Sequence, residues 1–241
     1  MKKNKQENGC RELTLRQTAK YLQKHDNYII LTHASPDGDT LGSAFALYYA
    51  LKEIGKAACV ICPDVIPEKY NYFARQTDHV SRDDATVVAV DVADKRLLGG
   101  LEEEFGDIVD LNIDHHISNV RFAKNLFLDA DAAATAESMY ELLGIMKVNI
   151  NDVTAKALYT GIATDTGCFK YSNVTAKTHM IVAQLYEYNI DAPEINRIMF
   201  DTKSRKLLEL ERMVLDASEF HFGGKCIILP VTAEMQEKTG C

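Results

Sequence analysis

The chain has 241 residues, of which 46% are hydrophobic and 26% charged, and this balance excludes a disordered or fibrous protein. Its 27 basic and 35 acidic residues give a formal net charge of −8, which argues against a protein that grips long duplex nucleic acid through the backbone phosphates. The apolar runs fall far short of the ~20 residues that a membrane-spanning helix needs, and the polar start lacks the apolar stretch of a secretion signal. We therefore expect a cytoplasmic protein with no membrane anchor and a flexible N-terminus over residues 1–10.

Short apolar strands alternate with amphipathic helices along the chain. This is the pattern of an α/β domain with an open, mostly parallel sheet flanked by helices. The predicted strands are residues 28–32, 56–62, 86–90 and 107–113. One helix is expected between the first two strands, closed by Gly55, and two more follow the fourth strand. Of these, the first is expected to end at Gly144 and the second to have Asp152 as its N-cap.

The pattern changes from Pro193 onward. Residues 204–216 alternate leucines with charges and predict a helix, and residues 220–229 predict a β-hairpin. We therefore expect the first domain to cover residues 11–192, a linker helix to cover 193–218, and a second domain to begin at 219. Only 12 residues follow Leu229, too few to complete a second sheet with its own core, so residues 219–241 are expected to form an incomplete domain.

Aspartate and histidine residues gather where the predicted strands and one helix end. A loop bent by Pro36 and Gly38 follows the first strand, and an Asp-His-His run follows the fourth. Ligands of open parallel sheets bind beyond the carboxyl ends of the strands, so we expect these side chains to converge. The residues are His33, Asp37, Asp39, Asp91, Asp114, His115, His116 and Asp165.

A metal site is the interpretation that this residue set favours. Each segment taken alone also fits a structural role as a turn or a helix cap, but capping chemistry does not readily account for four such segments together. Many carboxylate oxygens with a few imidazoles suit Mn²⁺, with Mg²⁺ or Co²⁺ as substitutes, better than the thiolate-rich sets of structural zinc.

In this order the segments resemble the motifs of the DHH phosphoesterase superfamily, which is named for its Asp-His-His signature. Residues 33–43 resemble the first motif, Asp91 the second, residues 114–116 the third, and residues 161–167 the fourth. Three further stretches resemble the branch of bacterial nano-RNases that also act as 3′-phosphoadenosine-5′-phosphate phosphatases; they are residues 116–119, 134–137 and 165–173. The resemblance covers roughly residues 10–220.

The resemblance implies that two Mn²⁺ ions bind per chain and activate a water for attack on phosphorus. Asp91 would bridge the two ions. The ligands of one ion would be His33, Asp37 and Asp91, and those of the other Asp39, Asp91, His115 and Asp165.

The resemblance also implies roles around the reacting phosphate. His116 would contact the scissile phosphate or protonate the leaving oxygen, and Asp114 would orient a neighbouring histidine. Asn119, Arg121 and Lys170 are candidates for contacts to substrate phosphate, although a solvated basic face is the alternative for Arg121.

The sequence therefore predicts a metal-dependent phosphoesterase that hydrolyses short oligoribonucleotides or the phosphate of a nucleoside 3′,5′-bisphosphate. An inorganic pyrophosphatase and a cyclic-dinucleotide phosphodiesterase would use the same metal centre. A truncated, non-catalytic nucleotide-binding module is the alternative from another class, because Gly224 is followed by Lys225 where relatives carry the histidine of a second, substrate-clamping (DHHA1-like) domain. Relatives also suggest a homodimer.

Overall fold

The computed structural model of the protein describes residues 6–7 and 9–241. The chain divides into two compact units, Met1–Asn196 and Arg197–Cys241. The division falls a few residues beyond residue 192, where the sequence predicts the first domain to end.

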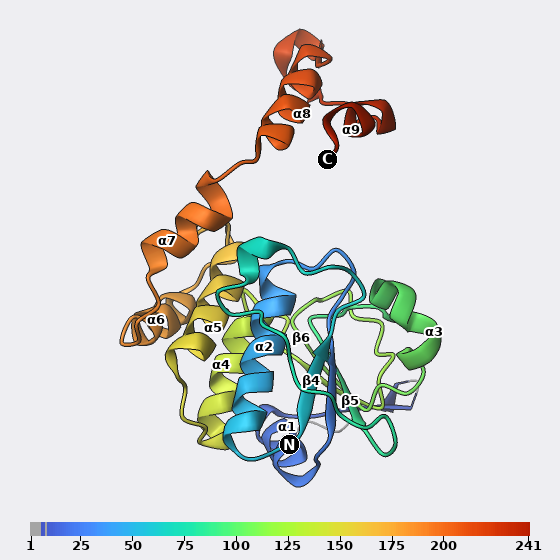
Figure 1. Cartoon of the computed structure of the whole chain (residues 1–241), viewed down its shortest axis with the longest axis vertical. Helices are drawn as coiled ribbons and strands as arrows, with labels where there is room; N and C mark the ends of the chain where they lie inside the picture. The colour runs from blue at the N-terminus through green and yellow to red at the C-terminus, as the bar shows by residue number, and fades with distance from the viewer. Residues whose placement is uncertain (1–5, 8) are drawn as a thin grey trace. The chain divides into compact units, whose positions relative to one another are not determined.

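The first unit is built on a seven-stranded sheet with the strand order β1-β2-β7-β6-β5-β3-β4 (Figure 1). Among the described residues, β1 pairs antiparallel with β2, and the other pairings in this sheet are parallel. This confirms the open, mostly parallel α/β sheet that the sequence predicts. The strands are β1 (Gln6–Glu7), β2 (Cys10–Glu12), β3 (Tyr28–Leu31), β4 (Ala58–Ile61), β5 (Thr86–Val90), β6 (Leu111–Asp114) and β7 (Asn125–Leu128).

The N-terminal residues that the structure describes differ from the flexible start expected over residues 1–10, because they form strands at one edge of the sheet. Gln6–Glu7 forms β1, and Cys10 begins β2 and is buried. The backbone of Leu13 continues the link to the sheet, because its N–H donates to the carbonyl of Leu126 at 2.7 Å. Residues 1–5 and 8, which the same prediction includes, lie outside the described residues.

Helices cover both faces of the sheet. On one face α2, α4 and α5 pack against one another, and α1 packs on α4; Figure 1 shows α3 on the opposite side of the strands. The helices of this unit are α1 (Leu15–Lys24), α2 (Gly38–Glu53), α3 (Glu102–Phe105), α4 (Thr135–Met146), α5 (Asp152–Asp165), α6 (Ala176–Leu185) and α7 (Ala192–Asn196), with 3₁₀ segments at Glu68–Tyr70 and Lys95–Leu101.

The central strands are buried on both faces, which explains why they read as continuous apolar runs rather than as an alternating pattern. Alternate residues of β3 and β5, such as Ile29 and Val87, join a cluster with Leu98 and Phe105 from the thinner helical layer. The intervening residues Ile30 and Val88 are also buried, and by strand alternation they point to the opposite face.

Two predicted helix boundaries are wrong. Gly144 lies inside α4, which continues to Met146 and ends at Lys147 in the left-handed conformation (φ 59°). Asp152 is the first residue of α5, and its N-cap is Asn151, whose side chain accepts a hydrogen bond from the N–H of Thr154. A lone glycine is tolerated in a helix interior, so it is a weak stop signal.

Residues 193–218 differ from the single linker helix that the sequence predicts there. The helix α7 is followed by a π-helical segment (Arg197–Asp201), a break at residues 202–204, and then α8 (Arg205–Asp216). Downstream lie the antiparallel strands β8 (Glu219–His221) and β9 (Cys226–Ile228), joined by a 3₁₀ turn (Phe222–Gly224), and α9 (Ala233–Thr239). The hairpin therefore forms, but it begins at Glu219, one residue before the predicted range of 220–229.

Among residues 197–241, only Thr239 is buried, so this unit encloses no apolar core of its own. Over the described part of the chain, none of the helices combines the length and the apolarity needed to cross a membrane.

Candidate metal centre

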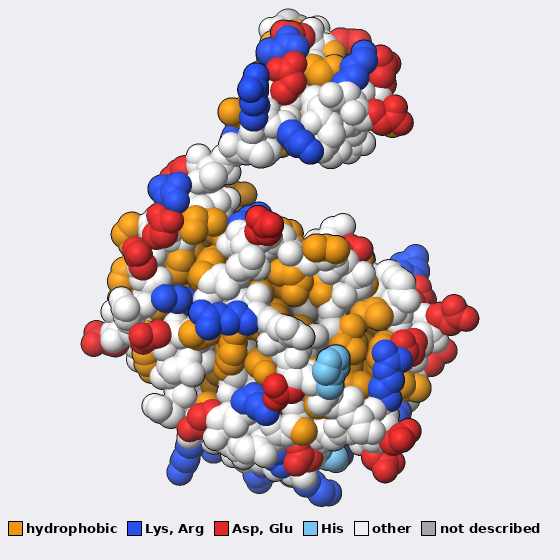
Figure 2. Space-filling view, in the orientation of Figure 1, with side chains coloured by type: hydrophobic (Ala, Val, Ile, Leu, Met, Phe, Trp, Pro, Cys, Tyr) orange, Lys and Arg blue, Asp and Glu red, His pale blue; other side chains and the backbone are white. Residues whose placement is uncertain are grey.

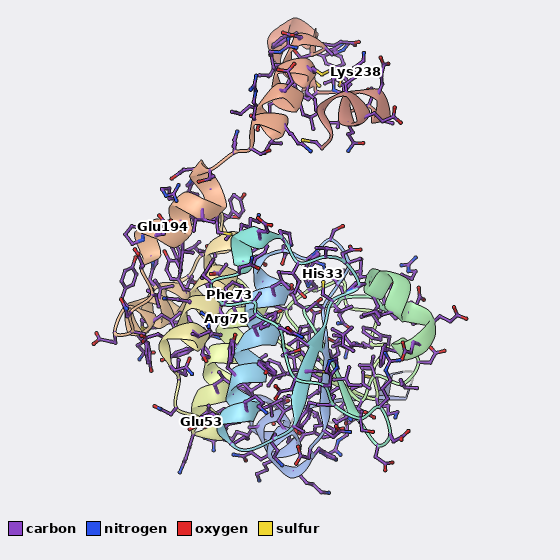
Figure 3. All side chains as sticks on the ribbon, viewed as in Figure 1. His33, Glu53, Phe73, Arg75, Glu194 and Lys238 are labelled. Carbon is purple, nitrogen blue, oxygen red and sulfur yellow. The ribbon has the colours of Figure 1, made fainter. Side chains whose placement is uncertain are left out.

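The predicted site residues meet beyond the carboxyl ends of the parallel strands. His33 follows β3, Asp91 follows β5 directly, and His115 follows β6. Figure 3 labels His33 beyond the ends of the strands. A small pocket of about 150 Å³ lies there, and its lining residues are His33, Asp37, Asp91, Leu97, His116 and Asp165.

One group of potential ligands comprises His33, Asp37 and Asp91. The Nδ1 atom of His33 lies 2.8 Å from the carbonyl oxygen of Ala34, which can only accept, so Nδ1 carries the proton and Nε2 keeps its lone pair. This Nε2 lies 3.7 Å from Oδ1 of Asp37 and 3.9 Å from Oδ2 of Asp91. Asp37 is held in place as the N-cap of α2.

A second group comprises Asp39, His115 and Asp165. The Nδ1 atom of His115 donates to the carbonyl of Ala132 at 3.1 Å, which again leaves Nε2 with the lone pair. This Nε2 lies 3.3 Å from Asp165 and 3.9 Å from Asp39, yet it is buried and lacks a well-oriented hydrogen-bond partner. A buried nitrogen that faces carboxylates in this way fits a metal ligand better than a structural histidine.

Asp91 lies between the two groups. Its Oδ2 is near His33, and its Oδ1 lies 3.7 Å from Nε2 of His115. The side chain is only 2% exposed, and burial together with the charges of Asp39 and Asp37 raises its pKa well above the usual range. The backbone of Asp91 has a positive φ of 61°, a conformation that costs energy for a residue with a Cβ and that occurs often at functional sites.

The N-terminus of α4 holds two of these carboxylates. The backbone N–H groups of Thr135 and Ala136 donate to the two oxygens of Asp39 at 2.6 and 2.9 Å. The hydroxyl of Thr135 donates to Oδ1 of Asp91 at 2.8 Å. Sequence reasoning assigned no chemistry to this segment, although it noted residues 134–137 as part of the resemblance. The sequence does contain a signal for this role, because Thr135 and Glu137 mark the start of a helix. The free N–H groups at a helix N-terminus stabilise a nearby anion.

The electrostatics of the pocket call for positive charge. Complete burial and the neighbouring Asp165 raise the pKa of Asp39 to about 7. Burial alone would lower the pKa of His115, but the carboxylates of Asp165, Asp39 and Asp91 outweigh it and raise the pKa to about 10. The residues that line the pocket, all described, include no Lys or Arg. Divalent cations would supply the missing charge in place of protons, so these residues fit the predicted pair of ions.

His116 and Asp114 form a hydrogen-bonded pair at the rim, and His116 also belongs to a third group of potential ligands with Asp91 and His115. The Nδ1–H of His116 donates to Oδ1 of Asp114 at 2.8 Å, so Nε2 is free on a side chain that is 43% exposed and lines the pocket. Asn119 donates to the other carboxylate oxygen at 2.6 Å. Burial would raise the pKa of Asp114, but these two hydrogen bonds hold it below its usual range.

The three predicted phosphate contacts are placed differently from the metal ligands. The side chain of Asn119 is occupied, because it donates to Asp114 and accepts from the N–H of Arg121 at 2.7 Å. The guanidinium of Arg121 pairs with Glu12 at 3.2 Å. Lys170 is exposed and does not line the pocket. Their contacts to substrate stay predictions.

The family model for the DHH family, N-terminal domain, matches residues 27–162. The fold and the site define a class of α/β proteins. Its members have a mostly parallel sheet with a cluster of carboxylates and imidazoles beyond the carboxyl ends of the strands. The chain belongs to the DHH family.

Relatives of known name are similar over most of the chain. The "Bifunctional oligoribonuclease and PAP phosphatase NrnA" of Thermus thermophilus is 35% identical over 218 residues, covering 88% of this chain and 64% of the relative. The protein of the same name from Bacillus subtilis is 27% identical over 188 residues, covering 76% of this chain and 59% of the relative. The chain therefore spans less than two thirds of the length of these two relatives.

A more distant relative is the "Probable manganese-dependent inorganic pyrophosphatase" of Enterococcus faecalis, which is 24% identical over 83% of this chain and 68% of its own length. Among solved structures, an exopolyphosphatase-related protein from Bacteroides fragilis has the same fold, with a TM-score of 0.80 at 23% identity over 94% of this chain and 71% of that chain.

Proposed function

We propose that the chain is the metal-dependent phosphoesterase part of an enzyme that hydrolyses short oligoribonucleotides, a nucleoside 3′,5′-bisphosphate, or both. The observation that carries this proposal is the juxtaposition of two ligand groups around Asp91, one with His33 and one with His115. Membership of the DHH family and the names of the relatives from Thermus thermophilus and Bacillus subtilis support the choice of substrate.

Two cations held at this site, Mn²⁺ in our proposal, would lower the pKa of a bound water and neutralise charge on the phosphate. Asp37 and His33 would hold one cation, Asp39, His115 and Asp165 would hold the other, and Asp91 lies within reach of both groups. The hydrogen bonds from Thr135 and Ala136 orient two of these carboxylates before any cation binds. Such preorganisation keeps the reacting geometry from depending on loop motion.

His116 acts at the leaving group. Its Nδ1–H is fixed by Asp114, so a proton on Nε2 faces the pocket when the ring is charged. Donation of that proton to the leaving oxygen gives a neutral alcohol rather than an alkoxide, and the ionised Asp114 stabilises the charged ring beforehand. Asp114 is therefore a positioning residue, and His116 is the group that touches substrate.

The surface supports a short substrate. Figure 2 shows Lys and Arg interspersed with Asp and Glu on the visible face of the first unit, without a continuous basic stripe. With a net charge of −8, the chain has no electrostatic footprint for long duplex nucleic acid. A substrate with one or two phosphates reaches the small pocket without needing such a stripe.

An inorganic pyrophosphatase is the second candidate. The relative from Enterococcus faecalis favours it, although that relative is less similar than the two oligoribonuclease and phosphatase relatives. The two functions differ in whether an organic group is attached to the scissile phosphate.

The experiment compares three substrates with Mn²⁺ present: a ribodinucleotide, adenosine 3′,5′-bisphosphate and pyrophosphate. We expect turnover of the first, the second or both, and a loss of turnover of about 10³-fold or more in Asp91→Ala and His115→Ala. Turnover of pyrophosphate alone would replace the proposal with the second candidate. Failure of the Mn²⁺-loaded protein, with two ions counted per chain, to turn over any of the three would support a non-catalytic binding module.

A further inference from the structure

A second hollow adjoins the pocket of the candidate metal centre and has no role in the chemistry described above. Its volume is about 370 Å³, and it shares one wall residue, Leu97, with the metal pocket. A group bound in the hollow would thus be separated from the reacting phosphate by a single side chain. The residues that line the hollow are Ala93, Asp94, Arg96, Leu97, Ser118 and Val120.

The walls of this hollow are extensions of the loops that carry the site. Ala93 follows Asp91 closely in the chain, and the N–H of Val120, downstream of His116, donates to the Ala93 carbonyl at 2.9 Å. The N–H of Ala34, the residue after His33, donates to the carbonyl of Leu97 at 2.7 Å. These backbone hydrogen bonds fix the distance between the hollow and the metal pocket, as a binding site for two parts of one molecule requires.

The chemistry of the walls suits a flat, apolar group with polar edges. Leu97 is 46% exposed and Val120 is 50% exposed, so both present aliphatic surface to solvent beside an anionic pocket. Polar groups surround this surface: the hydroxyl of Ser118, and the carboxylate of Asp94, which is 2.5 Å from Nη2 of Arg96. A nucleobase has this combination of apolar faces and hydrogen-bonding edges.

The size of the hollow and its position beside the metal pocket favour a nucleoside over a protein partner or a free anion. A protein partner needs about 800 Å² of surface on each side, far more than a hollow with six lining residues provides. A free anion has no reason to choose a site whose one cation, Arg96, is already paired with Asp94. A nucleoside attached to the phosphate in the metal pocket is brought to the hollow by its own covalent bond.

We propose that this hollow binds the nucleoside next to the scissile phosphate, with the base against the aliphatic side chains of Leu97 and Val120. The proposal rests on the proposed phosphoesterase function and adds a subsite to it. Burial of the base supplies binding energy at a distance from the reacting phosphate, which is where an enzyme gains discrimination between nucleotides and inorganic phosphates.

The test uses Val120→Ala, because Val120 lines the hollow and not the metal pocket, together with Leu97→Ala. The substrates are a ribodinucleotide and abasic dinucleotides that lack one or the other base. For each protein, kcat/KM of the intact dinucleotide is divided by kcat/KM of the abasic dinucleotide that is cleaved more slowly. We expect this ratio to fall about tenfold in either variant, because each substitution removes two or more methyl or methylene groups from the contact with the base. Ile145→Ala, which trims a part-exposed aliphatic residue of α4, is the control and should leave the ratio unchanged.

An unchanged ratio in both Val120→Ala and Leu97→Ala overturns the proposal. If the wild type turns over none of these dinucleotides, the hollow is tested separately; the proposed function fails only if adenosine 3′,5′-bisphosphate is not turned over either. Calorimetry with adenosine 5′-monophosphate and Mn²⁺ then measures Kd for the wild type and for Val120→Ala. Weaker binding by the variant retains the subsite, while equal affinity, or an absence of binding to the wild type, rejects it.

Discussion

Asp114 holds His116 by a 2.8 Å hydrogen bond between Oδ1 and Nδ1, and its other oxygen accepts from Asn119 at 2.6 Å. Replacing the carboxylate by an amide in Asp114→Asn removes the negative charge that favours the protonated ring, and it sets two amide donors against each other at Asn119. We expect kcat for the preferred substrate to fall about 10- to 100-fold. Mn²⁺ stoichiometry should stay at the wild-type value, because Asp114 belongs to none of the potential ligand groups.

The control for this variant is Asp107→Asn, at an exposed aspartate paired with Lys95. It should retain wild-type kcat. The split between kcat and KM gives the second readout: loss of the Asp114 carboxylate should lower kcat and leave KM near its wild-type value. Wild-type kcat in Asp114→Asn, or a fall in kcat/KM that comes from KM alone, would rule out this positioning role.

The two ligand groups predict a stepwise loss of cations. Asp37→Asn should remove one bound Mn²⁺ per chain and Asp165→Asn the other, while Asp91→Ala should weaken both because Asp91 lies within reach of both groups. Electron paramagnetic resonance of free Mn²⁺ during titration counts the bound ions without any assay of activity. Wild-type stoichiometry in all three variants would show that cations bind elsewhere.

The sequence predicts the features that depend on residues close together in the chain. It does not predict those that depend on contacts between distant segments. The strand pattern identified β3 and β5 because they are buried on both faces, and residue chemistry brought together His33, Asp91 and His115. The strand pattern does not predict the short strands β2 and β7, which are only 3 and 4 residues long and pair with each other across more than a hundred residues. No local pattern carries that information.

The same limit applies inside the site. The motifs predict Asp39 and Asp91 as metal ligands, but they do not predict the hydrogen bonds by which Thr135 orients both side chains, because the partners lie far apart in the chain. The sequence leaves two interpretations of Arg121 open, a phosphate contact and a solvated basic face, and it does not predict the ion pair of Arg121 with Glu12 on β2. These contacts between distant segments depend on the packing of α4 against α2 and α5.

The close packing of α2 on α5 depends on Gly42. A Cβ at Gly42 would lie 2.4 Å from the carbonyl oxygen of Ala157, a backbone atom that cannot move aside without shifting the helix. Gly42→Ala should therefore lower the free energy of unfolding by about 1–3 kcal/mol. Urea unfolding followed by circular dichroism measures it.

Gly144 provides the matched control for this substitution. It lies within α4 and has no heavy atom near the position of an added Cβ. Gly144→Ala should stabilise the protein by about 0.5–1 kcal/mol, because alanine loses less backbone entropy in a helix than glycine. Equal effects at the two positions would mean that helix propensity, rather than the distance between α2 and α5, governs both.

The stability of the metal-free protein should fall as the pH rises. Burial and the neighbouring Asp165 raise the pKa of Asp39 to about 7, so the folded state keeps a proton that the unfolded state has lost above about pH 4. This contribution is complete below pH 4 and is lost as the pH rises through 7. The pKa of His115 is raised to about 10, which adds a loss of the same sign between about pH 6.5 and 10.

Urea unfolding in the presence of a chelator at pH 5, 7 and 9 tests this expectation. The free energy of unfolding of the wild type should decrease at each step, and Asp39→Asn, which cannot ionise, should flatten the change between pH 5 and 7. Added Mn²⁺ should stabilise the wild type most at pH 9, where protons compete least for the ligands. The contradicting result is a free energy of unfolding that rises from pH 5 to 9 in the metal-free wild type and in Asp39→Asn alike. It would mean that the buried carboxylates do not repel one another strongly enough to require cations.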